Sequence, residues 1–153
     1  MAKNNEKKEK AFGDFKSAAE INECAAGLKA EGDTESLKAM AEENGIEPDI
    51  VTLYISGEMP YLCDDMTAAM GRLATELKEA SGRNKQLIET VIKPFVDSLL
   101  TDPDICRAVM DGKHTLDGIA TDIWNEASKI KTNSSAYIPD EEIRDKTEEY
   151  YRK

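Results

Sequence analysis

Residues that start and stop helices divide the sequence into short segments, and this punctuation constrains the fold more than any other feature. Ser17 is followed three residues later by Glu20, a pair whose hydroxyl and carboxylate satisfy free backbone N–H groups at a helix start. Pro48 and Pro103 each open an apolar stretch, at a position where a helix does not need the missing N–H. Gly57 closes one such stretch, as glycine commonly does. These signals predict a chain of short helices.

The apolar residues between these signals recur in steps of three and four, which is the spacing of one helix face. The stretch 87–100 is the most apolar, so we expect it to be central, with a kink or break near Lys93 because Pro94 removes a hydrogen bond. No alternating, strand-like pattern extends beyond about four residues. We therefore predict an all-α fold of seven or eight short to medium helices with no significant sheet.

The segment 82–85, with the sequence Gly-Arg-Asn-Lys, is the best candidate for a linker between two packed helical units. The units then cover residues 12–82 and 83–153. Residues 1–11 precede them and are rich in lysine, with few large apolar side chains that a core could bury. We expect this segment to be a disordered basic tail.

The formal net charge of −11 restricts the functions open to this chain. Binding to phosphate backbones requires clustered Lys and Arg, so we expect no direct nucleic-acid binding. No apolar run approaches the roughly 20 residues that span a membrane, and the lysine-rich start lacks the apolar stretch of a signal peptide. We therefore expect a cytoplasmic protein that does not contact membranes.

The residue types that usually carry chemistry form no established motif. Cys24, Cys63 and Cys106 are widely spaced and lack the C-x-x-C pattern of a zinc site, so reduced, buried thiols are expected. No glycine-rich phosphate loop and no nucleophile-elbow motif occurs in the sequence. We therefore predict no catalytic residues, no metal and no cofactor.

Carboxylates spread over rigid helices can resemble the phosphates of a nucleic acid, and such a surface can bind a basic protein. Many acids of this chain lie at helix starts, where they cap or stabilise the first turn, and that structural role is the plainer explanation. The acids that we predict to contact a partner lie on separate helices and on outward faces: Asp64, Asp65, Glu76, Glu79, Asp140, Glu141, Glu142, Glu148 and Glu149.

Five short segments near the C-terminus carry a resemblance to a known family: Cys106–Met110, His114–Gly118, Ile123–Ala127, Ile138–Ile143 and Glu149–Tyr151. Over about residues 95–153 the chain resembles the PcfK-like family, in which a helix leads through a variable loop to an I-x-D-E-x-(V/I) helix start and a terminal E-x-Y-Y. The segment beginning at Phe12 also looks like the front half of small proteins carried on mobile elements of Firmicutes.

The resemblance implies a mobile-element accessory protein without established catalytic activity. Some proteins of this type act as anti-CRISPRs against type II RNA-guided nucleases, which hold nucleic acid in a positively charged channel. Our first hypothesis is therefore a non-enzymatic, acidic interaction protein that binds such a basic surface.

Two further hypotheses compete with it. In the second, the chain is a conjugation accessory protein that docks on the transfer machinery through an apolar patch of Trp124, Tyr150 and Tyr151. In the third, the chain is a small enzyme working through Asp64, Asp65 and His114.

Overall fold

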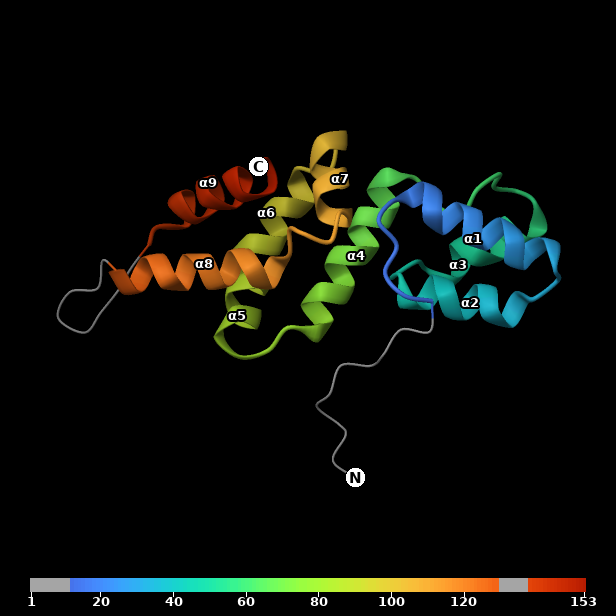
Figure 1. The fold of residues 1–153 in the computed structure, drawn as a ribbon, viewed down its shortest axis with the longest axis horizontal. Coiled ribbons are helices and arrows are strands. Elements are labelled where there is room, and N and C mark those ends of the chain that lie inside the picture. Colours follow the sequence, from blue (N-terminus) through green and yellow to red (C-terminus); the bar gives the residue numbers. More distant parts are fainter. Residues whose placement is uncertain (1–11, 130–137) are drawn as a thin grey trace, which may run out of the picture.

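The computed structural model describes residues 12–129 and 138–153, and every regular element in these ranges is a helix (Figure 1). The all-α prediction is confirmed. The described residues form eight continuous helical rods, because α5, η2 and α6 follow one another without a gap. In chain order the elements are α1 (Ala18–Ala30), α2 (Thr34–Glu43), α3 (Pro48–Ser56), α4 (Asp65–Glu79), α5 (Gly82–Leu87), η2 (Ile88–Ile92), α6 (Lys93–Ser98), α7 (Pro103–Met110), α8 (Leu116–Lys129) and α9 (Asp140–Tyr151).

The helix ends follow the start and stop signals of the sequence. The Ser17 hydroxyl accepts a hydrogen bond from the backbone N–H of Glu20 at 3.2 Å. The Glu20 carboxylate reaches back one residue further than expected and accepts from the N–H of Lys16 at 2.8 Å. Pro48 is the first residue of α3, and Gly57 ends that helix in the left-handed conformation with φ of 88°. Local sequence therefore determines where these helices begin and end.

The chain stays helical around Pro94, but the turn before the proline is π-helical rather than α-helical. The backbone N–H of Lys93 donates to the carbonyl of Ile88, five residues earlier, so Ile88–Ile92 forms a π-helical turn. Such a turn is one way in which a helix accommodates a residue that cannot donate a hydrogen bond. The kink or break expected near Lys93 is thus a π-turn, and the helix continues to Ser98.

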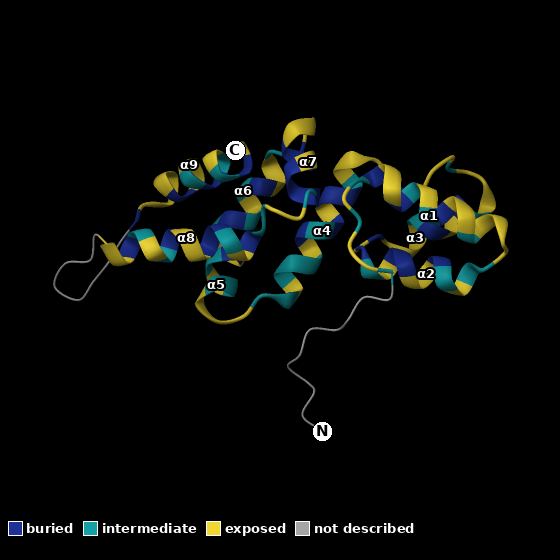
Figure 2. Ribbon diagram, in the orientation of Figure 1, coloured by how far each residue is buried: buried dark blue, intermediate teal, exposed yellow. Residues whose placement is uncertain are grey.

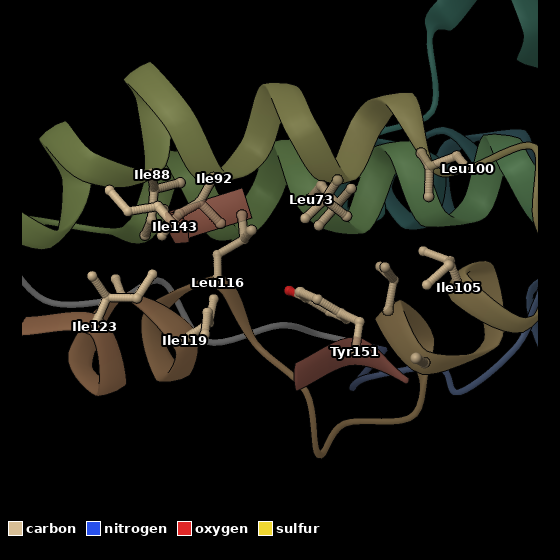
Figure 3. Close-up of a cluster of buried hydrophobic side chains, with 14 of the residues drawn as sticks. Leu73, Ile88, Ile92, Leu100, Ile105, Leu116, Ile119, Ile123, Ile143 and Tyr151 are labelled. Carbon is tan, nitrogen blue, oxygen red and sulfur yellow. The ribbon is translucent and has the colours of Figure 1, made fainter. Parts of the chain in front are cut away.

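The buried side chains form two clusters (Figure 2). The first joins α1, α2 and α3 around Ile21, Leu37 and Met40, and the second joins α4 to α9. Figure 3 shows the second cluster, with side chains from η2, α8 and the end of α9 converging on one interior. Its largest fully buried members are Leu73, Ile88, Ile92, Val96, Ile105, Val109, Leu116 and Tyr151.

Helix α4 connects the two clusters. Ala68 packs in the first cluster, whereas its neighbour Ala69 and the buried Leu73 pack in the second. Met110, at the end of α7, belongs to the first cluster. The boundary between two units at residue 82 remains a prediction. Helix α4 lies before residue 82, yet it contributes side chains to both clusters.

The backbones of α4 and the α2–α3 connection come unusually close. Gly45 has a φ of 70°, and a Cβ on Gly71 would lie 2.0 Å from the backbone oxygen of Asn44. Only glycine, which has no side chain, lets the two backbones come this close. This backbone contact joins the two clusters.

The expected basic tail at residues 1–11 lies outside the described residues. Among the described helices, none combines the length and the apolar character that crossing a membrane requires.

Candidate functional site

A groove of about 140 Å³ lies between α8 and α9. Residues on one face of α8 line one wall, because positions 119, 122, 123 and 126 fall at helical spacing. The opposite wall comes from the last two turns of α9 and from Lys153, two residues beyond the helix. The lining residues are Ile119, Asp122, Ile123, Glu126, Lys146, Glu149, Tyr150 and Lys153.

Carboxylates slightly outnumber the cations that line this groove, with three acids against two lysines. Asp122 and Glu126 on α8 and Glu149 on α9 flank a floor that includes the buried Ile119 and Ile123. Of its two lysines, Lys146 lies 3.8 Å from Glu142, one helical turn earlier on α9. The three carboxylates can pair with the cation of a partner's Lys or Arg side chain at the edge of the groove.

An aromatic cluster fixes the α9 wall of the groove. The Tyr150 hydroxyl accepts a hydrogen bond from the backbone N–H of Thr115 at 3.1 Å, at the start of α8. The Tyr150 ring meets the His114 ring edge-on at 5.4 Å and the Tyr151 ring at 5.2 Å. Tyr150 therefore ties α9 to the loop before α8.

His114 is held in place by Asp111. The His114 Nδ1 lies 2.8 Å from the Asp111 carboxylate, which also accepts the backbone N–H groups of Lys113 and His114. Burial raises the pKa of Asp111, but these hydrogen bonds outweigh it and leave the pKa below its usual value. The pair stabilises the loop between α7 and α8.

The predicted partner acids fall into separate groups rather than one face. Asp64 and Asp65 are exposed at the start of α4, beside α1 in Figure 1. Asp140, Glu141 and Glu142 are exposed in the first turn of α9, toward the end of the molecule that lies away from α1, α2 and α3. The contiguous acidic face that would favour the first hypothesis most strongly is therefore not formed by these residues.

Asp64 has a structural role as the N-cap of α4. Its carboxylate accepts the backbone N–H of Thr67 at 2.7 Å, and this bond holds the pKa of Asp64 below its usual value. Asp65, next to it, forms no ion pair within the described residues.

Three other predicted contact acids are half-buried. The Glu76 carboxylate accepts the backbone N–H of Leu116 at 2.8 Å, which places a negative charge at the start of α8, where the helix dipole favours it. Glu148 pairs with Arg152 at 2.9 Å, and Glu79 is partly covered. Glu76 and Glu148 are thus used inside the fold, while Glu149 lines the groove.

The aromatic residues of the second hypothesis do not form an exposed patch. Tyr151 is 2% exposed, and its ring lies in the core (Figure 3). Trp124 is half-buried beneath the guanidinium of Arg83, which lies 4.6 Å from its ring centre. Tyr150 is half-buried and lines the groove.

The residues of the third hypothesis lie apart. Glu76 accepts the backbone N–H of Leu116, two residues after His114. Asp65 lies about three turns, or roughly 16 Å, further back along α4. His114 pairs instead with Asp111.

The thiols are reduced and poorly activated. Cys63 and Cys106 are buried and Cys24 is half-buried, all three unpaired. Burial, together with the nearby carboxylates of Asp64 and Asp65, raises the pKa of Cys63 to about 12. Since the thiolate is the reactive form, Cys63 is protonated at neutral pH. Over residues 12–129 and 138–153, no group of His, Cys, Asp or Glu side chains is placed to hold a metal ion.

No family model matches this chain, and neither does any curated protein or solved structure. The resemblance to the PcfK-like family therefore stays a prediction.

Asp122 and Glu126 were not among the predicted contacts. They stand one turn apart, beside Ile119 and Ile123, so the helical spacing of α8 placed them at the edge of its buried face. Which helix packs on that edge depends on tertiary structure, and the sequence did not indicate that α9 brings Glu149 there.

The two adjacent tyrosines provide a matched test of this region. The Tyr151 hydroxyl is buried without a hydrogen-bond partner among the described residues, so Tyr151→Phe is expected to leave the free energy of unfolding unchanged or raise it by up to about 1 kcal/mol. Tyr150→Phe removes the bond to Thr115 and is expected to cost about 1 kcal/mol. Urea denaturation followed by circular dichroism measures both, and a larger loss for Tyr151→Phe than for Tyr150→Phe would contradict this packing.

Proposed function

We propose that this protein is a non-enzymatic interaction protein whose acidic helical surface binds a basic protein partner. The observation that carries the proposal is the α8–α9 groove, where Asp122, Glu126 and Glu149 outnumber the two lysines that also line it. Basic side chains of a partner would pair with these carboxylates.

The overall charge supports the same kind of partner. A net charge of −11 attracts a basic surface from a distance, which accelerates encounter more than it strengthens the final complex. The groove then supplies the local contacts that determine where the partner binds.

The most specific form of the proposal is an anti-CRISPR of a mobile genetic element. Type II RNA-guided nucleases hold nucleic acid in a positively charged channel, and occupation of that channel by carboxylates would exclude the DNA target. The choice of this nuclease rests on the resemblance of the C-terminal residues to the PcfK-like family.

A cleavage assay tests this form. The full chain is added to a purified type II nuclease loaded with guide RNA, and cleavage of a matched DNA target is followed. We expect cleavage to decrease as protein is added, and to recover when the salt concentration is raised. Undiminished cleavage with the protein in large excess would contradict the anti-CRISPR assignment.

The second candidate is a conjugation accessory protein that docks through apolar contacts at Tyr150 and Trp124. A pull-down of the partner from a conjugative host, at low and at high salt, distinguishes this candidate from the first. A partner bound through apolar contacts is retained at high salt, whereas one bound through charges is lost.

A further inference from the structure

The hydroxyl of Tyr150 lies directly over the backbone of Gly118, near the start of α8. A Cβ added to Gly118 would lie 2.5 Å from this hydroxyl oxygen and 3.5 Å from the ring carbon that carries it. The same oxygen accepts the backbone N–H of Thr115 at 3.1 Å. Gly118 therefore leaves open the space that the Tyr150 hydroxyl fills, and any other residue at this position would compete for it.

The Tyr150 side chain has little freedom to move away from Gly118. Its ring packs edge-on against His114 at an interplanar angle of 84°, and against Tyr151 at 86°. His114 is itself hydrogen-bonded to Asp111, and Tyr151 is buried in the core. A tyrosine held on two sides of its ring and at its hydroxyl is part of a packed interior, where added volume forces neighbouring elements to shift.

This contact lies at the N-terminal end of the α8 wall of the groove. Gly118, Asp122 and Glu126 follow one another at intervals of four, so they form one row along α8. Helix α9 lies beside α8 in Figure 1, and Tyr150 directly follows Glu149, the acid of the opposite wall. The position of Tyr150 over Gly118 therefore determines where Glu149 lies relative to the acids of the row.

We propose that Tyr150 and Gly118 are positioning residues for the acidic walls of the groove. The tyrosine hydroxyl, placed over the glycine, fixes α9 against α8 at the separation that lets acids on both walls contact one basic segment of a partner. This inference rests on the proposed function, because it concerns the same groove. The contact itself belongs to the folded chain, so it can be tested first without any partner.

A double-mutant cycle, measured by urea denaturation, tests the contact. Gly118→Ala is expected to raise the equilibrium constant for unfolding at least about tenfold. In the Tyr150→Phe background the same change should raise it about threefold or less, because only an ordinary 3.5 Å contact with the ring remains. The Thr115 hydroxyl, 2.9 Å from the new Cβ, accounts for the remaining cost. An equal cost of Gly118→Ala in both backgrounds would overturn the proposal.

His114 reports the position of Tyr150 in solution. It is the only histidine of the chain, so its ring-proton NMR signals are identified without ambiguity. Because the two rings lie 5.4 Å apart and an aromatic ring shifts the signals of nearby protons, Gly118→Ala should move the His114 signals. Gly27→Ala, where a Cβ meets nothing within 4 Å, is the matched control and should leave them in place. Unmoved signals in Gly118→Ala would overturn the proposal.

Binding of a hexaarginine peptide at low salt then tests the positioning role, with isothermal titration calorimetry as the measurement. The wild-type chain is expected to bind the peptide, and Gly118→Ala should bind it at least about fivefold more weakly. The double variant with Tyr150→Phe should recover most of the affinity. Circular dichroism confirms that each variant is folded. Equal affinities of the wild-type chain and Gly118→Ala would overturn the positioning role alone, whereas a wild-type chain that does not bind the peptide would contradict the proposed function as well.

Discussion

Replacing Gly71 by alanine is expected to lower the free energy of unfolding by about 3 kcal/mol or more. The new Cβ would lie 2.0 Å from the backbone oxygen of Asn44, a separation that real Cβ contacts essentially never show. Because the obstacle is backbone rather than a flexible side chain, α4 or the end of α2 must move. That movement would disrupt both buried clusters, since α4 contributes to each.

Gly27 provides the matched control for this substitution. It also lies within a helix, α1, but a Cβ there would have no neighbour within 4 Å. Gly27→Ala is therefore expected to stabilise the protein by about 1 kcal/mol, because alanine favours the helix over glycine. Thermal and urea denaturation followed by circular dichroism measure both variants. A cost for Gly71→Ala below about 1 kcal/mol would show that the two backbones are not in contact.

Reversing the three groove acids is expected to weaken binding to the basic partner about a hundredfold or more. The substitutions are Asp122→Lys, Glu126→Lys and Glu149→Lys, all on the walls of the α8–α9 groove. Each would replace an attraction to a partner cation by a repulsion, and like charges brought together at an interface cost several kcal/mol. Surface plasmon resonance with the immobilised, guide-loaded nuclease measures the affinity and the association rate.

A matched set of reversals separates the groove from the net charge. Glu23, Glu31 and Glu42 are exposed on or at the ends of α1 and α2, away from the groove. Each reversal adds two charges, so either set of three changes the net charge from −11 to −5. The control set is expected to slow association less than about tenfold, through weaker steering alone. Equal losses from both sets would contradict a specific role for the groove.

The helix boundaries could be predicted from sequence because the signals that set them are local. The Ser17 cap, Pro48 at the start of α3 and the left-handed Gly57 each act on backbone groups within a few residues. Pro94 also acts locally, yet the outcome was a π-turn rather than a break, because the buried side chains of Ile92 and Val96 hold the helix in the core before and after the proline.

The candidate site could be predicted only in part, because the exposure of a side chain and its hydrogen-bond partners depend on which helices pack together. Glu76 has the sequence context of a surface acid. In the structure α8 begins beside it, and the first backbone N–H of α8 donates a hydrogen bond to its carboxylate. Tyr150 and Tyr151 are neighbours in sequence, and on a helix they point in different directions, one into the groove and one into the core. Glu149 was a predicted contact, whereas its companions Asp122 and Glu126 became visible once α9 was placed against α8.

The most direct test of the proposed function is an equilibrium titration of a guide-loaded type II nuclease with the wild-type chain at several salt concentrations. If carboxylates occupy its basic channel, the dissociation constant should rise about tenfold or more between roughly 50 mM and 200 mM salt. Absence of binding at the lowest salt, or an affinity that does not change with salt, would contradict the account.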